Sequence, residues 1–205
     1  MKRILSITLL LLCVTAAVAA TSEAQIKQRI GQAAAAMRSM QCEFVQTKHL
    51  KMLNDRVVST GRMYYQQSNR LRWEYVSPYS YTFVYNGSKV AIRTGKRSDV
   101  IDANKNKVFR EIGRVMMSSV VGDCLNDTRS FKASIAETST EWVATLVPQR
   151  KEMKQLFKQI KLHFDRKRAL VTTVELIERN GDSTVIQLKN VKTNVNIPAS
   201  TFAVA

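Results

Sequence analysis

Near the start of the chain, apolar side chains recur at three- and four-residue steps, which is the spacing of one helix face. The positions that form this stripe are Ile26, Ile30, Ala33, Ala34 and Met37. Thr21 and Ser22 stand directly before it, and both residue types cap helix N-termini. The pattern therefore predicts an amphipathic helix whose apolar face packs against the rest of the protein.

From Met40 onward the apolar period changes to two, as in half-buried β-strands. Met40, Cys42 and Phe44 alternate with polar neighbours, and Asn86-Gly87 is a strong signal for a tight hairpin. Strands are predicted over residues 57–66, 71–75, 79–85, 89–94, 131–137, 142–147, 156–164, 170–177 and 184–191. Residues 95–107 are expected to form a loop or a weak strand pair, and 148–154 a loop.

A second helical stripe interrupts the strands over residues 108–121. It includes Val115, Met116 and Val120, and Gly122 follows it as a C-cap. The short connections elsewhere favour antiparallel pairing of neighbouring strands. We therefore predict a mainly β fold with some α-helix, in which helices cover a curved antiparallel sheet.

The concave face of a strongly curved sheet is too wide for its own side chains to fill. Helices with apolar stripes could cover this face and leave a cavity, in which each buried methylene of an acyl chain contributes about 0.8 kcal/mol. Met116 and Met117 suit such a cavity because thioether side chains adapt to ligands of varied shape. The same stripes are also typical of a filled core, so periodicity alone leaves both interpretations open.

The first twenty residues have the pattern of a secretory signal peptide. A basic start precedes an uncharged run over residues 4–18 and a group of small residues, and the run is short for a membrane span. We expect cleavage near Ala19 or Ala20. No linker or internal repeat divides the remaining residues 21–205, which are predicted to form one domain.

The chain is strongly basic, with a formal net charge of +16 over 205 residues. Removal of Lys2 and Arg3 with the signal peptide would lower this charge by two, to +14. Such an excess often accompanies nucleic-acid binding, but export argues against nucleic acid as a partner. We expect the basic surface to face solvent or an anionic membrane.

Candidate catalytic chemistry is sparse in this sequence. No GxSxG, HExxH, P-loop or GxGxxG motif occurs, and His49 and His163 have no metal-ligand partner at helical spacing. The sequence therefore predicts neither an enzyme, nor a metal site, nor a cofactor. Cys42 and Cys124 remain after signal cleavage, and an oxidising compartment would permit a disulfide between them, but the sequence leaves this pairing open.

A series of short segments follows a distinctive order along the chain. They are Phe44-Val45-Gln46, TGRMYY at 60–65, RLRWEY at 70–75, Pro78, Asn86-Gly87, LVP at 146–148, 157–165, NGDST at 180–184, and 190–202. Each is brief, but together they cover nearly all of the chain after the signal peptide. In this order and spacing they resemble the LolA family of periplasmic lipoprotein carriers.

This resemblance implies an unclosed antiparallel β-barrel of about eleven strands, covered by two or three helices. It also implies a carrier, which we expect to be monomeric, that takes acylated lipoproteins from an inner-membrane ABC transporter. The cargo would pass to an acceptor at the outer membrane or to an anionic membrane surface. The residues expected to line the hydrophobic cavity for acyl chains are Phe44, Leu71, Trp73, Tyr75, Phe83, Val115, Met116 and Val120.

One departure from the family pattern concerns the contact that holds the helical lid closed. Many members carry a basic residue followed by Pro before the R-x-W strand, and the basic side chain helps to hold the lid. Gln67 and Ser68 occupy these positions here, so Arg70 or Arg72 is the candidate substitute.

Two other functions fit the same residues. A LolA-fold module could bind another lipid or glycolipid, or act as a sensor, because fold alone does not decide cargo. An envelope protein with a filled core would have no cavity at all.

Overall fold

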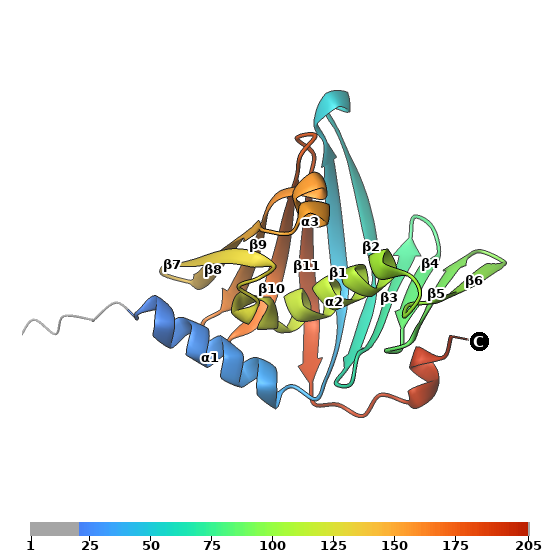
Figure 1. The fold of residues 1–205 in the computed structure, drawn as a ribbon, viewed down its shortest axis with the longest axis horizontal. Coiled ribbons are helices and arrows are strands. Elements are labelled where there is room, and N and C mark those ends of the chain that lie inside the picture. The colour runs from blue at the N-terminus through green and yellow to red at the C-terminus, as the bar shows by residue number, and fades with distance from the viewer. Residues whose placement is uncertain (1–20, 205) are drawn as a thin grey trace, which may run out of the picture.

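The computed structural model describes residues 21–204, apart from the side chains at positions 107, 108, 111 and 112. The signal peptide expected at residues 1–20 lies outside the described residues. The described chain forms an antiparallel sheet of eleven strands with three α-helices and three short 3-10 helices (Figure 1).

The first six strands are β1 (Ser39–Leu50), β2 (Asp55–Gln66), β3 (Arg70–Ser77), β4 (Tyr81–Tyr85), β5 (Lys89–Thr94) and β6 (Arg97–Asp102). The other five are β7 (Phe131–Glu137), β8 (Glu141–Pro148), β9 (Phe157–Asp165), β10 (Leu170–Glu178) and β11 (Ser183–Thr193). Their order across the sheet is β6-β5-β4-β3-β2-β1-β11-β10-β9-β8-β7. Because β6 and β7 are the two edges and do not pair with each other, the sheet is not closed, and the predicted mainly β, unclosed architecture is confirmed.

Strand alternation decides which side chains enter the interior. In β1, Met40, Cys42 and Phe44 are all buried, as their spacing predicts. In β3, Leu71 and Trp73 are buried, whereas the charged residues that alternate with them lie on the opposite face. The inner faces of successive strands thereby form one continuous apolar surface.

Helix α1 (Glu23–Ala36) begins where the sequence predicts. The Ser22 hydroxyl accepts a hydrogen bond from the backbone N–H of Gln25 at 3.2 Å, and the Gln25 side chain accepts from the Ser22 N–H at 3.0 Å. This reciprocal capping box satisfies two backbone donors that the first helical turn cannot. The helix lies along β7 and β10, with Ile26 and Ile30 fully buried.

Helix α2 (Lys107–Val121) confirms the second helical stripe. Asn106 caps its N-terminus by accepting a hydrogen bond from the Phe109 N–H, and Gly122 ends it with a φ of 84°. A Cβ at Gly122 would also lie 2.8 Å from the Phe164 ring, so both conformation and space favour glycine there. Figure 1 shows α2 crossing the sheet.

One segment matches an alternative that the sequence left open, and another differs from the sequence expectation. Residues 95–107 contain β6, which pairs with β5 along its whole length. Its side chains are nearly all exposed, so this edge strand has no apolar alternation to reveal it. The expected loop at 148–154 contains most of α3 (Lys151–Leu156), which is too short to show a helical period.

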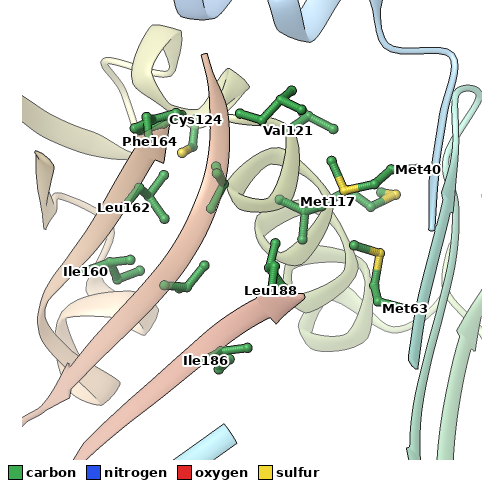
Figure 2. Packing of buried hydrophobic residues seen from close by; sticks show 14 of the residues in the cluster. Met40, Met63, Met117, Val121, Cys124, Ile160, Leu162, Phe164, Ile186 and Leu188 are labelled. Atoms are coloured by element: carbon green, nitrogen blue, oxygen red, sulfur yellow. The ribbon is translucent and has the colours of Figure 1, made fainter. Parts of the chain in front are cut away.

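The main core lies between the sheet and helices α1 and α2. In Figure 2, Met117 and Val121 of α2 lie between Met40 and Met63 on one side and Leu162 and Phe164 on the other; all belong to one buried cluster. A smaller cluster lies on the outer face of the sheet. There Ile197 and Phe202, from the C-terminal segment that includes η3 (Ala199–Phe202), pack on Val84 and Ala91.

Candidate functional site

A largely apolar cavity of about 370 Å³ lies between the sheet and helices α2 and α3. Its walls are formed by Gln46, Trp73, Tyr75, Val115, Met116, Ser119, Val120, Met153, Leu156, Phe157, Ile160, Val174, Leu176 and Ile186. None of these side chains is charged. The volume falls within the range of pockets that hold small organic ligands.

The cavity lies between one face of α2 and the inner face of the sheet. Val115, Met116, Ser119 and Val120 project from one face of the helix at helical spacing, and β1, β3 and β9–β11 provide the opposite wall. Both α2 and α3 contribute a methionine to the walls, and such side chains can adjust to a guest.

Five of the eight residues expected to line a cavity border this one. They are Trp73, Tyr75, Val115, Met116 and Val120. Phe44, Leu71 and Phe83 lie instead within the packed core.

Phe44 has a supporting position behind the cavity wall. Its ring stacks on Trp73 with a centroid distance of 4.4 Å and meets Tyr75 edge-on at 5.2 Å. Phe83 is paired with Trp73 across the β3–β4 ladder, and both Leu71 and Phe83 are at most 5% exposed. Residues on one face of a strand can therefore belong either to the packed core or to the cavity wall, depending on which side chains cover them.

The C-terminal strands supply most of the lining that sequence reasoning missed. These residues are Phe157, Ile160, Val174, Leu176 and Ile186, together with Gln46, Ser119, Met153 and Leu156. The alternation in β9, β10 and β11 identifies their inner faces, and this signal could have suggested several of them. Met153 and Leu156 could not be found in this way, because they project from the short helix α3.

Three polar side chains interrupt the apolar wall on the β1 and β3 side. The Tyr75 hydroxyl donates a hydrogen bond to Gln46 Oε1 at 2.9 Å, and burial raises the pKa of Tyr75, which keeps the hydroxyl protonated. Trp73 Nε1 is shielded from solvent and has no hydrogen-bond acceptor among the described residues.

The two arginines expected to hold the lid point away from it. Arg72 pairs with Glu74 at 3.2 Å, and Arg70 donates to Gln66 at 3.4 Å. Both alternate with Leu71 and Trp73, so they lie on the face of β3 opposite α2. Strand alternation therefore directs both side chains away from α2, and neither arginine replaces the family's lid contact in this structure.

Gln67 makes a helix contact of its own at the β2–β3 turn. Its Nε2 donates to the Ala35 carbonyl at the end of α1 at 3.4 Å. Ser68 follows with a φ of 73°, a conformation that proline cannot adopt, which explains why the family's proline is absent from this turn. The turn is thus tied to α1 rather than to α2.

An ion pair anchors the middle of α2. Arg114 Nη1 lies 2.6 Å from Asp127 Oδ2, and Arg114 Nη2 donates to the Ser130 hydroxyl at 3.1 Å. Burial alone would raise the pKa of Asp127, but hydrogen bonds from Ser130 and Arg114 outweigh it and hold that pKa below its ordinary value. Through this contact α2 is joined to the segment that leads into β7.

Cys42 and Cys124 are both free thiols, so the pairing that the sequence left open is not formed in this structure. Burial raises the pKa of each thiol to about 12, which keeps both protonated and unreactive at neutral pH. Among the side chains that the structure describes, no group of three or more His, Cys, Asp or Glu is arranged to bind a metal ion.

The tip of the β1–β2 hairpin, η1 (Lys51–Leu53), carries exposed apolar side chains. Met52 is 92% exposed and Leu53 is 71% exposed, and the basic residues Lys51 and Arg56 lie beside them. The hairpin rises above the rest of the sheet in Figure 1. Among the described residues, no helix has the length and apolar character needed to cross a membrane.

The family model described as "Outer membrane lipoprotein carrier protein LolA" matches residues 35–205. An outer-membrane lipoprotein carrier protein of Pseudomonas fluorescens is 28% identical over 70% of this chain and 66% of its own length, just under two thirds. One from Methylococcus capsulatus is 24% identical over 80% of this chain and 76% of its own length.

Among solved structures, the Pseudomonas aeruginosa MucA/MucB complex contains a chain that shares this fold. It has a TM-score of 0.53 and 16% identity, and the match covers 88% of this chain and 61% of that one. Because the family model spans most of the sequence, this chain belongs to the LolA family of outer membrane lipoprotein carrier proteins.

Proposed function

We propose that this protein shields the acyl chains of lipoproteins in the cavity beneath α2 and carries them through the periplasm to the outer membrane. The observation that supports this function best is the uncharged, mainly aliphatic and aromatic wall of the cavity. Burial of each methylene stabilises the complex by about 0.8 kcal/mol. The protein acts by binding and release, and it carries out no chemical reaction on its cargo.

A carrier must also release what it binds. The volume of about 370 Å³ suits part of an acyl chain, so a lipoprotein with several chains requires α2 and α3 to move away from the sheet. The apolar contacts of α2 that close the cavity are then exchanged for contacts with the cargo. Because similar apolar surface is buried before and after loading, the exchange is nearly balanced and can be reversed at the destination.

The proposed route begins with export. Residues 1–20 would direct secretion and be removed near Ala19 or Ala20, which leaves residues 21–205 as the carrier domain in the periplasm. Loading would occur at an inner-membrane ABC transporter. Delivery would occur at an outer-membrane acceptor or directly at an anionic membrane surface, and the exposed apolar hairpin tip with its basic neighbours suits contact with such a surface.

A second function is a LolA-fold module with another cargo or a sensory role. The observation that favours it is the similarity to the fold in the MucA/MucB complex, where a chain of this shape has a protein partner. This alternative predicts a free lipid or a protein, rather than an acylated lipoprotein, in the isolated complex.

The decisive experiment is native mass spectrometry, with lipid extraction, of the protein purified from the periplasm of its own host. Acylated lipoprotein bound to the protein would support the carrier function, whereas free lipid alone would favour the second function. A Leu176→Trp variant should retain less cargo because the larger side chain fills the cavity. Val147→Trp is the matched control, since Val147 is 41% exposed on β8.

A further inference from the structure

We propose that η1, the β10–β11 turn (residues 179–182) and α3 form one docking surface for an anionic lipid bilayer. Helix α3 would be a second membrane contact beside the hairpin tip, and the two together would turn the edge of the cavity toward the membrane. This inference rests on the proposed function and specifies the surface with which the loaded carrier meets its destination.

Hydrogen bonds join these three segments, which lie far apart in the sequence. The backbone N–H of Lys51 in η1 donates to Asp182 Oδ1 in the β10–β11 turn at 2.9 Å. At the start of the same turn, Arg179 Nε donates to the Lys154 carbonyl of α3 at 2.9 Å, and the Arg179 backbone N–H donates to the Leu156 carbonyl at 3.1 Å. All three segments lie at the upper end of the sheet in Figure 1, where they form one surface.

The docking surface combines exposed apolar side chains with positive charge. Met52 and Leu53 of η1 and Leu156 of α3 are each more than half exposed. The two helices together contain three exposed lysines and a single acidic residue. Apolar side chains that can enter the interface, with lysines beside them, suit a bilayer that carries negatively charged headgroups.

The opposite end of the sheet has a different character. Its turns are at residues 67–69, 86–88, 138–140 and 166–169, and they consist of polar residues, one glycine and one alanine. Residues 166–168 are all basic, so this end also carries positive charge, but it lacks the large apolar side chains of the other turns. The combination of charge and apolar surface therefore distinguishes the end formed by η1 and α3.

Leu156 connects the docking surface with the cavity. Its side chain borders the cavity together with Met153 and Phe157, and it is also 55% exposed to solvent. Helix α3 thus lies at the edge where the cavity meets solvent. A bilayer in contact with α3 would be next to the acyl chains, so a chain that leaves the cavity past this helix would enter lipid rather than water.

The first test measures binding to phosphatidylcholine vesicles with and without phosphatidylglycerol. Lys151→Gln/Lys154→Gln should bind the anionic vesicles about ten- to thirtyfold more weakly than the wild type, because each lysine near such a surface adds to the attraction. Lys89→Gln/Lys167→Gln removes the same charge at the opposite end of the sheet and should leave the affinity unchanged. Equal losses in the two variants would overturn the docking surface in favour of a diffuse attraction by the net charge.

An environment-sensitive fluorescent probe on α3 tests the contact without removing charge. Because Cys42 and Cys124 are buried, a Gln155→Cys variant should be labelled selectively at this exposed position. On vesicles with phosphatidylglycerol, the emission of the probe should shift to the blue. A probe on Ser139→Cys, in the β7–β8 turn at the other end of β8 from α3, should not shift. A probe on α3 that stays in water while the protein binds vesicles would overturn the role of this helix.

A measurement in solution separates the docking surface from the proposed function. A soluble acylated peptide should bind equally to the wild type and to Lys151→Gln/Lys154→Gln, since neither lysine borders the cavity. Failure of the wild type to bind this peptide would overturn the proposed function, whatever the vesicles show. Peptide binding without attachment to protein-free vesicles would overturn only the docking surface, and attachment to native outer-membrane vesicles alone would assign this end to a protein acceptor instead.

Discussion

The ring of Phe44 lies directly over Gly61, its ladder partner on the adjacent strand β2. A Cβ at position 61 would lie 2.5 Å from Phe44 Cζ and closer still to the Glu74 carbonyl oxygen of β3. Phe44 in turn stacks on Trp73, which borders the cavity. The absence of a side chain at Gly61 therefore allows the aromatic cluster behind the cavity to form.

We predict that Gly61→Ala destabilises the protein by about 1–3 kcal/mol, because the backbone oxygen of Glu74 cannot move aside as a flexible side chain could. Chemical denaturation would measure the loss. Gly31→Ala in α1 is the matched control, since its Cβ would meet only Asn126 Nδ2 at an ordinary 3.8 Å. This control should be neutral or stabilising by up to about 1 kcal/mol. Equal midpoints for Gly61→Ala and the wild type would contradict the close approach.

The two tryptophans should respond differently to replacement by phenylalanine. Trp142 is fully buried, donates to Glu137, and has the Arg29 guanidinium 4.8 Å from its ring centroid. Trp73 makes no such hydrogen bond. We expect Trp142→Phe to lower the melting temperature clearly more than Trp73→Phe, because only the first variant removes a hydrogen-bond donor from Glu137 and replaces the indole next to Arg29 with a weaker cation–π partner. Thermal unfolding of both variants would check the order, and the reverse order would be evidence that Trp73 Nε1 is already bonded.

The sheet was accessible to sequence reasoning because nearly every strand has one buried and one exposed face. Alternation in β1 and β3 placed Phe44 and Trp73 on the inner side, and the Gly122 cap located the end of α2. Edge strand β6 was predicted only as an alternative to a loop, because it is held by main-chain pairing with β5 and buries few side chains. Apolar periodicity in a sequence arises where one face of an element is buried, so an element that buries few side chains shows no such periodicity.

The position of the cavity was harder to predict than the inner face of the sheet that forms its wall. Phe44 and Trp73 share a face and are both buried, yet only Trp73 borders the cavity, because the Phe44 ring packs behind Trp73. The expected lid contact is absent for a simpler reason. Arg70 and Arg72 alternate with the inward-facing residues of β3, so they lie on the face opposite α2. The sequence shows on which face of a strand a residue lies. Which residues of that face border the cavity depends on the three-dimensional packing of α2 and α3.

The ion pair between Arg114 and Asp127 gives the stability of the protein a defined pH dependence. The pKa of Asp127 is lower in the folded protein than in the unfolded chain, where it is about 3.9. The stabilisation by this carboxylate is therefore fully present above about pH 4 and is lost as the pH falls through the folded-state pKa. Asp127→Asn should reduce the free energy of unfolding by a constant amount from pH 5 to pH 7, and by a smaller amount below about pH 4.

Urea unfolding of the wild type and the variant across this pH range would measure the difference. Asp182→Asn is a suitable comparison, because Asp182 lies in an exposed turn far along the chain and does not contact α2 in any hydrogen bond of the described residues. A difference between wild type and Asp127→Asn that grows on acidification would show that the carboxylate is not stabilised by its partners on α2 and near β7.

The exposed hairpin tip should matter for membrane contact and not for folding. Leu53 is 71% exposed, so Leu53→Glu removes no core packing, yet it places a negative charge where an apolar side chain could enter the interface of an anionic bilayer. We expect about tenfold weaker binding to vesicles that contain phosphatidylglycerol, with an unchanged unfolding midpoint. Val100→Glu is the control, because Val100 is 51% exposed on the edge strand β6, away from the tip. Binding of the wild type should also weaken with added salt, since Lys51 and Arg56 would contribute by charge. Salt-insensitive binding, or an equal loss in both variants, would direct attention to another surface of the protein for delivery.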